Sequence, residues 1–427
     1  MITAVLFGLL ALLLLLSVPI AISLGIASTV ALLLSGKVSG SYVPQGLVTS
    51  IDSFPLMAVP FFILAGDLMG KGGLSTRLIN VGRMIFGRYT GGLAIIAVVT
   101  CMFFAAISGS GPATVAAVGS IMLPAMLKDG YRPSFSTGLV ASAGSLGVII
   151  PPSIPMVIYA TSANVSVSKM FLAGVIPGLL IGLALIGYAW FQAKRDGLKP
   201  GDEAPTWREI LAGLNDAKWA LLAPVIILGG IYGGVFTPTE AAAVGVIYGF
   251  VVGAFVYREL TPKNLYAVIA ESALITASIM IIVGSATIFG RVLTLEGIPS
   301  MIAETITTWV SQPWLLLLLI TLLLLVIGTF MEALAAIIIL TPILLPLAVS
   351  IGISPEHFGI LMIVNLGIGM VTPPVGVNLF VASRVGNVPF EEVVRGSFRP
   401  ILVMLGVLLL VTYIPALTLW LPSLFGL

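Results

Sequence analysis

The chain begins with an apolar run from Ile2 to Leu34 that contains no charged residue. Only 8% of its 427 residues are Asp, Glu, Lys or Arg, whereas soluble domains carry roughly 25%. So little charge cannot cover a folded surface in water, and the sequence therefore predicts an all-α protein that crosses a membrane several times. Because the first run lacks a basic leading segment, we interpret it as a retained span and not as a secretory signal. Candidate spans lie at 2–35, 54–70, 135–160, 170–191, 219–235, 239–257, 268–290, 357–382 and 397–425.

The remaining composition excludes several classes of protein. The net charge is +2, and no basic tract is long enough to bind nucleic acid. A single cysteine, Cys101, and a single histidine, His357, rule out a disulfide framework and the usual Cys/His zinc site. The sequence has no GxxxxGK(S/T) loop for binding ATP phosphates. We therefore expect neither an enzyme nor a resident cofactor.

Two further apolar stretches are interrupted near their centres. Residues 91–127 are broken by the Gly-rich segment 108–112, and residues 314–349 are broken near 328–332. Each stretch is long enough for two helices, with only a short interruption between them. We interpret both as re-entrant helical hairpins whose tips lie inside the membrane, and the alternative is a pair of ordinary spans joined by a tight turn.

Prolines and glycines recur along the chain at a nearly constant offset in sequence number. The pair Pro151-Pro152 returns as Pro373-Pro374, at an offset of 222. The same offset relates Pro124 to Pro346, Gly147 to Gly369, Ala160 to Ala382 and Gly174 to Gly396, and an offset of 224 relates Gly66 to Gly290 and Gly73 to Gly297. The sequence therefore indicates one unit that has been duplicated.

The charges indicate that the two copies have opposite orientations in the membrane. Segment 71–88 contains Lys71, Arg77, Arg83 and Arg88, whereas its counterpart 295–312 has no basic residue and carries Glu296 and Glu304. Basic loops favour the cytoplasm, so the first segment and the long loop 192–218 are predicted to be cytoplasmic. This assignment places the N-terminus in the cytoplasm and the C-terminus outside, provided that 2–35 is a single element.

Inverted repeats with paired, Gly/Pro-interrupted segments are typical of secondary transporters, which bind their substrate near mid-membrane at the repeat interface. A proline supplies no N–H, so the two Pro-Pro breaks leave carbonyl groups without helical partners. Hard cations prefer oxygen ligands, and we predict two sodium sites, each between a hairpin tip and a break. The candidate side chains are Ser108, Ser110 and Thr114 in the first copy and Thr329, Glu332 and Thr372 in the second. Alternatively, the breaks only shape kinked helices, and the hydroxyl groups bond to their own helix.

A new half-helix begins after each break, and its N-terminus attracts anions. Ser153 directly follows Pro152, and Asn378 comes about one turn after Pro374. Both are therefore candidates for holding a carboxylate substrate, with Asn365 and Thr114 as further candidates. An interhelical hydrogen bond that serves packing is the alternative role for Asn378.

Three motifs in this order resemble the large membrane subunit of tripartite ATP-independent periplasmic (TRAP) transporters. They are SGSGPAT at 108–114, GVIIPPSIP at 147–155 and VTPPVGVN at 371–378. The resemblance extends over the whole chain and implies an inverted-repeat, elevator-type secondary transporter with two re-entrant helical hairpins. It implies sodium-driven uptake of an organic acid, such as a C4-dicarboxylate or sialic acid, across a bacterial inner membrane. The implied partners are a periplasmic substrate-binding protein and a small four-helix membrane subunit, which we expect to be a separate chain.

The resemblance also implies which residues contact sodium and which helices move. The sodium contacts would be Ser108, Ser110, Gly147, Ile150 and Pro151 in the first copy, and Gly328, Thr329, Glu332, Met370 and Thr372 in the second. Residues 91–160 and 291–382 would form the moving transport domain. Residues 1–90, 161–290 and 383–427 would form the scaffold.

Two other functions remain as alternatives. A sodium/carboxylate symporter that works without a binding protein would show the same duplicated hairpins. An intramembrane serine protease would need a nucleophile and a base, for which Ser108 and His357 are the only candidate pair, but no third orienting residue is evident.

Overall fold

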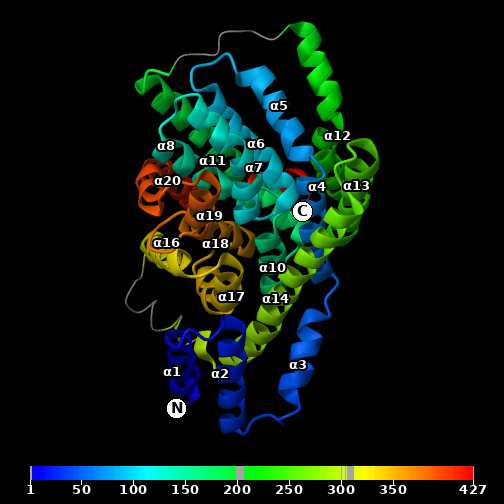
Figure 1. Cartoon of the computed structure of the whole chain (residues 1–427). Coiled ribbons are helices and arrows are strands. Elements are labelled where there is room, and N and C mark those ends of the chain that lie inside the picture. The colour runs from blue at the N-terminus through cyan, green and yellow to red at the C-terminus, as the bar shows by residue number, and fades with distance from the viewer. Residues whose placement is uncertain (1, 199–205, 300, 303, 305–311, 427) are drawn as a thin grey trace.

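The computed structural model describes residues 2–198, 206–299, 301–302, 304 and 312–426 (Figure 1). Within these ranges every regular element is helical, as the sequence predicts. One group of helices packs around α4 and α14 and the other packs around α8 and α18. The α4/α14 group comprises α1 (Ile2–Leu15), α2 (Ile20–Ser35), α3 (Tyr42–Ile51), η1 (Pro55–Met57), α4 (Ala58–Lys71), α5 (Leu74–Phe86), α12 (Trp207–Tyr232), α13 (Pro238–Val251), η2 (Val252–Val256) and α14 (Pro262–Leu295).

The α8/α18 group contains both broken stretches and both Pro-Pro breaks. It comprises α6 (Gly92–Ser108), α7 (Gly111–Lys128), α8 (Pro133–Gly144), α9 (Leu146–Ile149), α10 (Ile154–Ala163), α11 (Val167–Arg195), α16 (Pro313–Phe330), α17 (Ala333–Ser350), α18 (Pro355–Gly369), α19 (Val377–Gly386), α20 (Phe390–Tyr413) and α21 (Ala416–Leu424).

The helices of the described residues are those of a polytopic membrane protein. By length and composition eight of them could each cross a membrane, or up to ten spans result if each of two bent pairs counts as one. The bent pairs are α3 with η1–α4, which turns through 62°, and α8–α9 with α10, which turns through 40°.

The predicted duplication is confirmed at the level of individual helices. The second hairpin helices, α7 and α17, begin and end at positions related by the same offset of 222. Helices α8 and α18 both begin with a proline, Pro133 and Pro355, at that offset, and each is followed by a Pro-Pro pair joined by a cis peptide bond. The hairpin α6–α7 lies in the upper half of Figure 1 and α16–α17 lies in the lower half, as expected for copies of opposite orientation.

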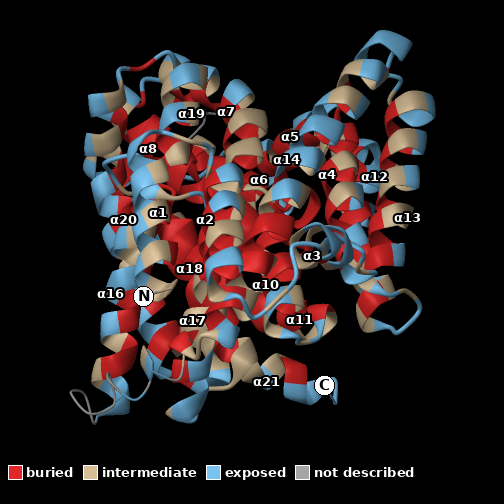
Figure 2. Cartoon of the chain, turned by 90° about the horizontal axis from the view of Figure 1, so that it is seen from below, coloured by how far each residue is buried: buried red, intermediate tan, exposed pale blue. Residues whose placement is uncertain are grey.

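Helices α8 and α18 form the centre of the molecule. Every residue from Phe135 to Gly144 and from His357 to Gly369 is buried, and Figure 2 shows the buried residues concentrated there. Buried polar groups need hydrogen-bond partners, and the hydroxyl groups in these helices find them locally, as Ser142 does by donating to the carbonyl of Gly138 at 2.8 Å. The buried hydroxyl groups of α8 are therefore satisfied by nearby carbonyl groups and need no charged partner.

The prediction of a single span over 2–35 is wrong. Helix α1 ends at Leu15, the chain turns at Ser17 (φ 60°), and α2 packs alongside α1. Pro19 cannot donate a helical hydrogen bond, which favours a break here, although α11 and α17 continue through prolines. Figure 1 shows the N-terminus at the same end of the molecule as the α2–α3 connection. The condition for a cytoplasmic N-terminus is therefore not met.

Three other expected segments differ in detail. The span predicted at 397–425 consists of α20 and a separate helix, α21, which packs against α11. Segment 71–88 contains helix α5, which carries Arg77 and Arg83, while Lys71 ends α4 and Arg88 lies in the turn after α5. The loop predicted at 192–218 is shorter, because α11 extends to Arg195 and α12 begins at Trp207. Residues 199–205 of that loop, and residues 300, 303 and 305–311 of segment 295–312, lie outside the described residues.

Candidate functional site

A cavity of about 350 Å³ lies between the two groups of helices. We call it the central cavity. Both hairpin tips line it through residues 108–113 and 332–334, and both broken helices reach it at Val148, Ile154, Met370 and Val377. The opposite wall comes from α4 and α14. The four interruptions of the backbone therefore converge on one cavity, as the repeat pattern predicts.

Three oxygen atoms cluster at the first hairpin tip. The Ser108 hydroxyl lies 3.0 Å from the Thr114 hydroxyl and 3.4 Å from the Ser110 carbonyl oxygen, and the Thr114 hydroxyl donates to that carbonyl at 2.7 Å. Ser108 and Thr114 are buried. A hydroxyl group that donates its proton still has lone pairs to offer a cation. The bonds to the local backbone therefore do not exclude cation binding.

Gly147 brings the first broken helix against this oxygen cluster. A Cβ atom at Gly147 would collide with the Ser110 carbonyl oxygen and with the Thr114 hydroxyl, so only glycine allows the approach. Because Pro151 has no N–H, the Gly147 carbonyl has no helical donor four residues later. A backbone oxygen without a helical partner thus lies in the segment that packs on the cluster.

The first hairpin tip also contacts both breaks. Gly109 has a left-handed backbone (φ 60°), and its carbonyl accepts a hydrogen bond from the Ile154 N–H at 3.4 Å. On the other side, a Cβ atom at Gly111 would lie 3.2 Å from Oδ1 of Asn378. The tip is therefore held between α10 of the first copy and α19 of the second.

The second hairpin tip is built differently. Gly328 lies against the backbone of Gly369, and the Thr329 hydroxyl donates to the carbonyl of Val326 at 2.7 Å. Glu332 caps α17 by accepting a hydrogen bond from the Ala335 N–H at 3.4 Å, and its exposed side chain lines the central cavity. This tip presents a carboxylate where the first presents hydroxyl groups.

Hydrogen bonds within residues 368–378 span the second break. The Met370 carbonyl accepts a hydrogen bond from the Asn378 N–H at 3.0 Å, and the Thr372 hydroxyl donates to the Ile368 carbonyl at 2.8 Å. Pro373 and Pro374 are exposed, whereas Pro151 and Pro152 are buried. The two breaks are therefore alike in backbone but not in surroundings.

The predicted substrate residues make hydrogen bonds within the protein. The buried Ser153 hydroxyl donates to the Val148 carbonyl at 2.6 Å, and the amide nitrogen of Asn378 donates to the Ala141 carbonyl on α8 at 3.3 Å. The latter bond is the interhelical contact that the sequence offered as an alternative. The amide nitrogen of Asn365 donates to the carbonyl of Leu361 at 2.7 Å. Both asparagines keep a buried Oδ1 atom without a hydrogen-bond partner.

The structure brings together some of the predicted residues but not all of them. Those that line the central cavity are Ser108, Ser110, Glu332 and Met370. Four others contact the tips or the breaks but do not line the cavity: Thr114, Gly147, Gly328 and Asn378. Ile150 and Pro151 line a separate apolar groove of about 450 Å³ beside α11 and α12.

The wall of the central cavity that α4 and α14 form is not evident from the sequence. Gly66 of α4 lies so close to the first tip that a Cβ atom there would be 2.9 Å from the Cα atom of Ser108. Asp67 lines the cavity and accepts a hydrogen bond from the Ser272 hydroxyl at 2.6 Å. Gly66 is visible in the sequence only as a member of the repeat, and Asp67 only as a charge near the end of a candidate span.

The two residues proposed for a protease dyad do not form one. His357 is buried at the start of α18, where one ring nitrogen lies 2.7 Å from the Thr418 hydroxyl and the other 3.3 Å from the Thr412 carbonyl. Ser108 bonds to Thr114 at the first tip. Among the described residues no group of three or more His, Cys, Asp or Glu side chains could hold a metal ion.

A family model described as "Tripartite ATP-independent periplasmic transporter, DctM component" matches residues 7–417. The chain is 51% identical over 413 residues to the isethionate TRAP transporter permease protein DctMQ of Oleidesulfovibrio alaskensis. The matched region covers 97% of this chain and 65% of that longer protein. It is 46% identical over 404 residues to the C4-dicarboxylate TRAP transporter large permease protein DctM of Pseudomonas aeruginosa, covering 95% and 94% of the two chains.

A third relative is the sialic acid TRAP transporter large permease protein SiaM of Vibrio cholerae. It is 40% identical over 407 residues, covering 95% of each chain. Among solved structures, the crystal structure of the Alcanivorax borkumensis YdaH transporter matches with a TM-score of 0.63 and 16% identity, covering 87% of this chain and 88% of that one. At that identity the match supports the fold alone.

Proposed function

Because the chain belongs to the family of DctM components, the large permease subunits of TRAP transporters, we propose that it carries a small organic anion into the cell, driven by a sodium gradient. The central cavity supports this function best, since both inverted tips and both breaks line it together. This is the arrangement that alternating access around a site near mid-membrane requires.

The proposed substrate is an organic acid or a sulfonic acid. Relatives that match nearly all of this chain are named for isethionate, C4-dicarboxylates and sialic acid. Helices α7 and α10 both begin at the lining of the central cavity, and the N–H groups at a helix N-terminus favour an anion. We propose Ser153 and Asn378 as residues that orient the substrate, with Thr114 and Asn365 behind them.

We propose that one sodium ion binds at the first tip. Its ligands would be Ser108, Thr114 and the Ser110 carbonyl, together with backbone oxygen near Gly147, Ile150 and Pro151. The three tip oxygens lie within 3.4 Å of one another, a spacing that a small cation can draw into its coordination shell. A second ion would bind at the other tip near Gly328, Thr329, Glu332, Met370 and Thr372.

We propose an elevator motion in which the hairpins and broken helices move against the helices around α4 and α14. Gly66 supports this division, because a small residue lets α4 approach the first tip closely without an interlocking side chain. Helices α11 and α20 pack against the moving helices α6 and α8. They would therefore form the border between transport domain and scaffold.

The proposed location is the inner membrane of a bacterium, with α5 and the α11–α12 connection on the cytoplasmic side because they carry the basic residues. With α1 and α2 as two separate helices, residue 2 would then lie on the opposite side, unlike the orientation expected from the sequence. Helix α20 carries Arg395 and Arg399 in its first half, and we propose that this half faces the cytoplasm.

We propose a periplasmic substrate-binding protein and a small membrane subunit as partners. The relative named DctMQ is longer than this chain, so the small subunit is tested both as a separate chain and as a fusion. Uptake is measured in proteoliposomes that contain this chain and the small subunit, with labelled isethionate, succinate and N-acetylneuraminate.

Uptake that needs both sodium and an added binding protein supports the proposed function. Sodium-dependent uptake without any binding protein would instead support the stand-alone sodium/carboxylate symporter. Uptake that is unaffected by collapse of the sodium gradient would contradict both.

A further inference from the structure

A second cavity, of about 480 Å³, lies beside the central one. We call it the outer cavity. It is lined by α3, α10, α14 and α17, and its polar residues include Tyr42, Thr161, Ser162, Thr287 and Arg291. In Figure 1 these helices lie in the half of the molecule that holds the N-terminus, opposite the basic α5 and the α11–α12 connection.

The two cavities follow one another along the same helices. Ile154 of α10 and Leu334 of α17 line the central cavity, and Ile158 and Ile338, each four residues later, line the outer one. On α14 the change occurs between Ile282 and Val283. Four residues are about one helical turn, or roughly 6 Å. Only a narrow layer of apolar side chains therefore separates the two cavities.

Arg291 gives the outer cavity its charge. No carboxylate of the described residues pairs with it, and its guanidinium carbon lies 5.6 Å from the centre of the Tyr42 ring. Gly46 leaves room for the side chain, because a Cβ atom there would lie 3.0 Å from Nη1 of Arg291. An arginine held this way keeps donors free for a carboxylate or sulfonate.

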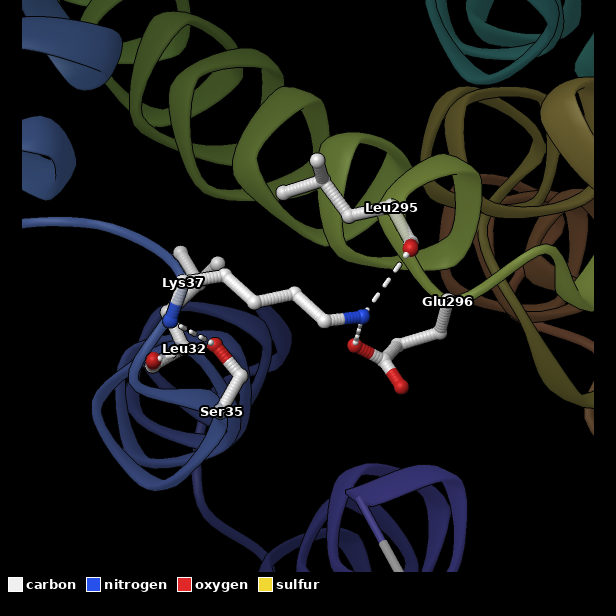
Figure 3. A network of polar contacts seen from close by, with 5 residues as sticks. All are labelled: Leu32, Ser35, Lys37, Leu295 and Glu296. Carbon is white, nitrogen blue, oxygen red and sulfur yellow. Dashed lines mark hydrogen bonds and ion pairs between the residues drawn. The ribbon is translucent and has the colours of Figure 1, made fainter.

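The acid that follows Leu295 of the outer cavity in the chain is neutralised. Glu296 pairs with Lys37 at 2.7 Å, and the same ammonium group donates to the carbonyl of Leu295 at 3.3 Å (Figure 3). Leu295 lines the outer cavity. The ion pair therefore leaves the charge of Arg291 uncompensated by Glu296.

We infer that the outer cavity is an entry site in which Arg291 binds the carboxylate or sulfonate group of the substrate before it passes the apolar layer into the central cavity. This inference rests on the proposed function for the identity of its ligand. Its electrostatic part can be tested without any transport.

The first test measures the electric potential in the outer cavity. Ser162 is exposed and lines this cavity, so Ser162→Cys supplies a reactive thiol, while the native Cys101 is fully buried. The introduced thiol is modified with two methanethiosulfonate reagents, the anionic 2-sulfonatoethyl and the cationic 2-trimethylammonioethyl compound. Each rate is divided by the rate of the same reagent with free 2-mercaptoethanol, which removes the difference in intrinsic reactivity. The reagents are added from the periplasmic side to the whole complex.

The normalised ratio of anionic to cationic rates should exceed one and should fall about tenfold in Arg291→Gln, as a nearby unit charge in a partly screened cavity implies. Arg291→Lys should retain most of the ratio. Arg208→Gln, an exposed arginine of α12 remote from the cavity, is the matched control and should change nothing. An unchanged ratio in Arg291→Gln overturns the inference, and so does labelling only from the side of α5.

The second test measures uptake of the three labelled compounds. For each one transported, Arg291→Gln should raise KM about tenfold and leave kcat within about twofold, since docking and not translocation is weakened. An unchanged KM overturns the docking role even if the labelling ratio falls. If the ratio falls but none of the compounds is transported, the anion site stands and the proposed function fails.

Discussion

Ser110 and Glu332 occupy the same position in the two copies and differ in charge. Each is the N-cap of the second hairpin helix, α7 or α17, and both line the central cavity. The residues around them differ as well, because Ser108 and Thr114 correspond to Phe330 and Ala336. The first tip thus has three clustered oxygens, whereas the second has a carboxylate and the Thr329 hydroxyl, which bonds to its own helix.

Removing a hydroxyl group from the first tip should weaken sodium binding. In Ser108→Ala and Thr114→Ala the sodium concentration for half-maximal uptake should rise roughly tenfold, since a polar contact to a charge is worth about 1.5–3 kcal/mol. Thr114→Ser keeps the oxygen and should stay close to the parent. Ser120→Ala, on the exposed face of the same helix, is the control. Sodium titration of uptake measures the effect, and an unaltered half-saturation in both alanine variants would refute a side-chain role.

Glu332 has two separable roles. As an N-cap it stabilises α17, and Glu332→Ala should lower the free energy of unfolding by about 1 kcal/mol. Glu332→Gln keeps a side-chain oxygen for the Ala335 N–H but removes the charge. If the carboxylate also serves a cation, Glu332→Gln should unfold at a temperature near that of the parent yet need several times more sodium for uptake. Equal sodium dependence in Glu332→Gln and parent would leave only the capping role.

Gly66 should not tolerate a side chain. Because a Cβ atom there would lie 2.9 Å from the Cα atom of Ser108, Gly66→Ala must push α4 away from the first tip, and Gly66→Val must push it further. Uptake should fall in that order, with a larger loss in maximal rate than in apparent affinity. Gly229→Ala on α12, where nothing lies within 4 Å of the added atom, is the matched control. Full activity of Gly66→Val would contradict the proposed sliding contact.

His357 should matter for stability and not for transport chemistry. Its ring ties α18 to α20 and α21 through Thr412 and Thr418. His357→Ala removes the ring's bonds to the Thr412 carbonyl and the Thr418 hydroxyl, of which the hydroxyl keeps its bond to the Pro415 carbonyl. The loss should cost about 1–3 kcal/mol, visible as a lower melting temperature of the purified complex. The sodium dependence of uptake by the folded fraction should be unchanged. A melting temperature equal to that of the parent would show that the ring bonds carry no net stability.

Much of the architecture is predictable because it depends on features with a strong local signal. The Pro-Pro pairs at 151–152 and 373–374 and the Gly-rich tip at 108–112 break helices wherever they stand, so their common spacing reveals the repeat. The end of α1 near Ser17 is only partly predictable, since Pro19 marks a possible break but hydropathy does not show whether the run 2–35 kinks there or turns back.

The candidate site is harder to predict for a different reason. Residues at the tips can be named because they flank the breaks, but the scaffold wall is assembled from α4 and α14, which are far apart in sequence. Asp67 and Arg291 each lie near the end of an apolar run, where a charged side chain commonly reaches toward water. Only the packing of α3 and α17 against α14 shows that Arg291 faces a cavity.

The unequal tips have a consequence for the resting behaviour of the protein. In the proposed elevator motion, two halves of identical chemistry related by a two-fold axis would make the inward-open and outward-open forms isoenergetic. A hydroxyl-lined tip opposite an acidic one removes that degeneracy, and a difference of about 1.4 kcal/mol is enough to shift the populations tenfold. Without any ion gradient the empty carrier should therefore dwell mostly on one side, while the direction of net flux is still dictated by the gradients.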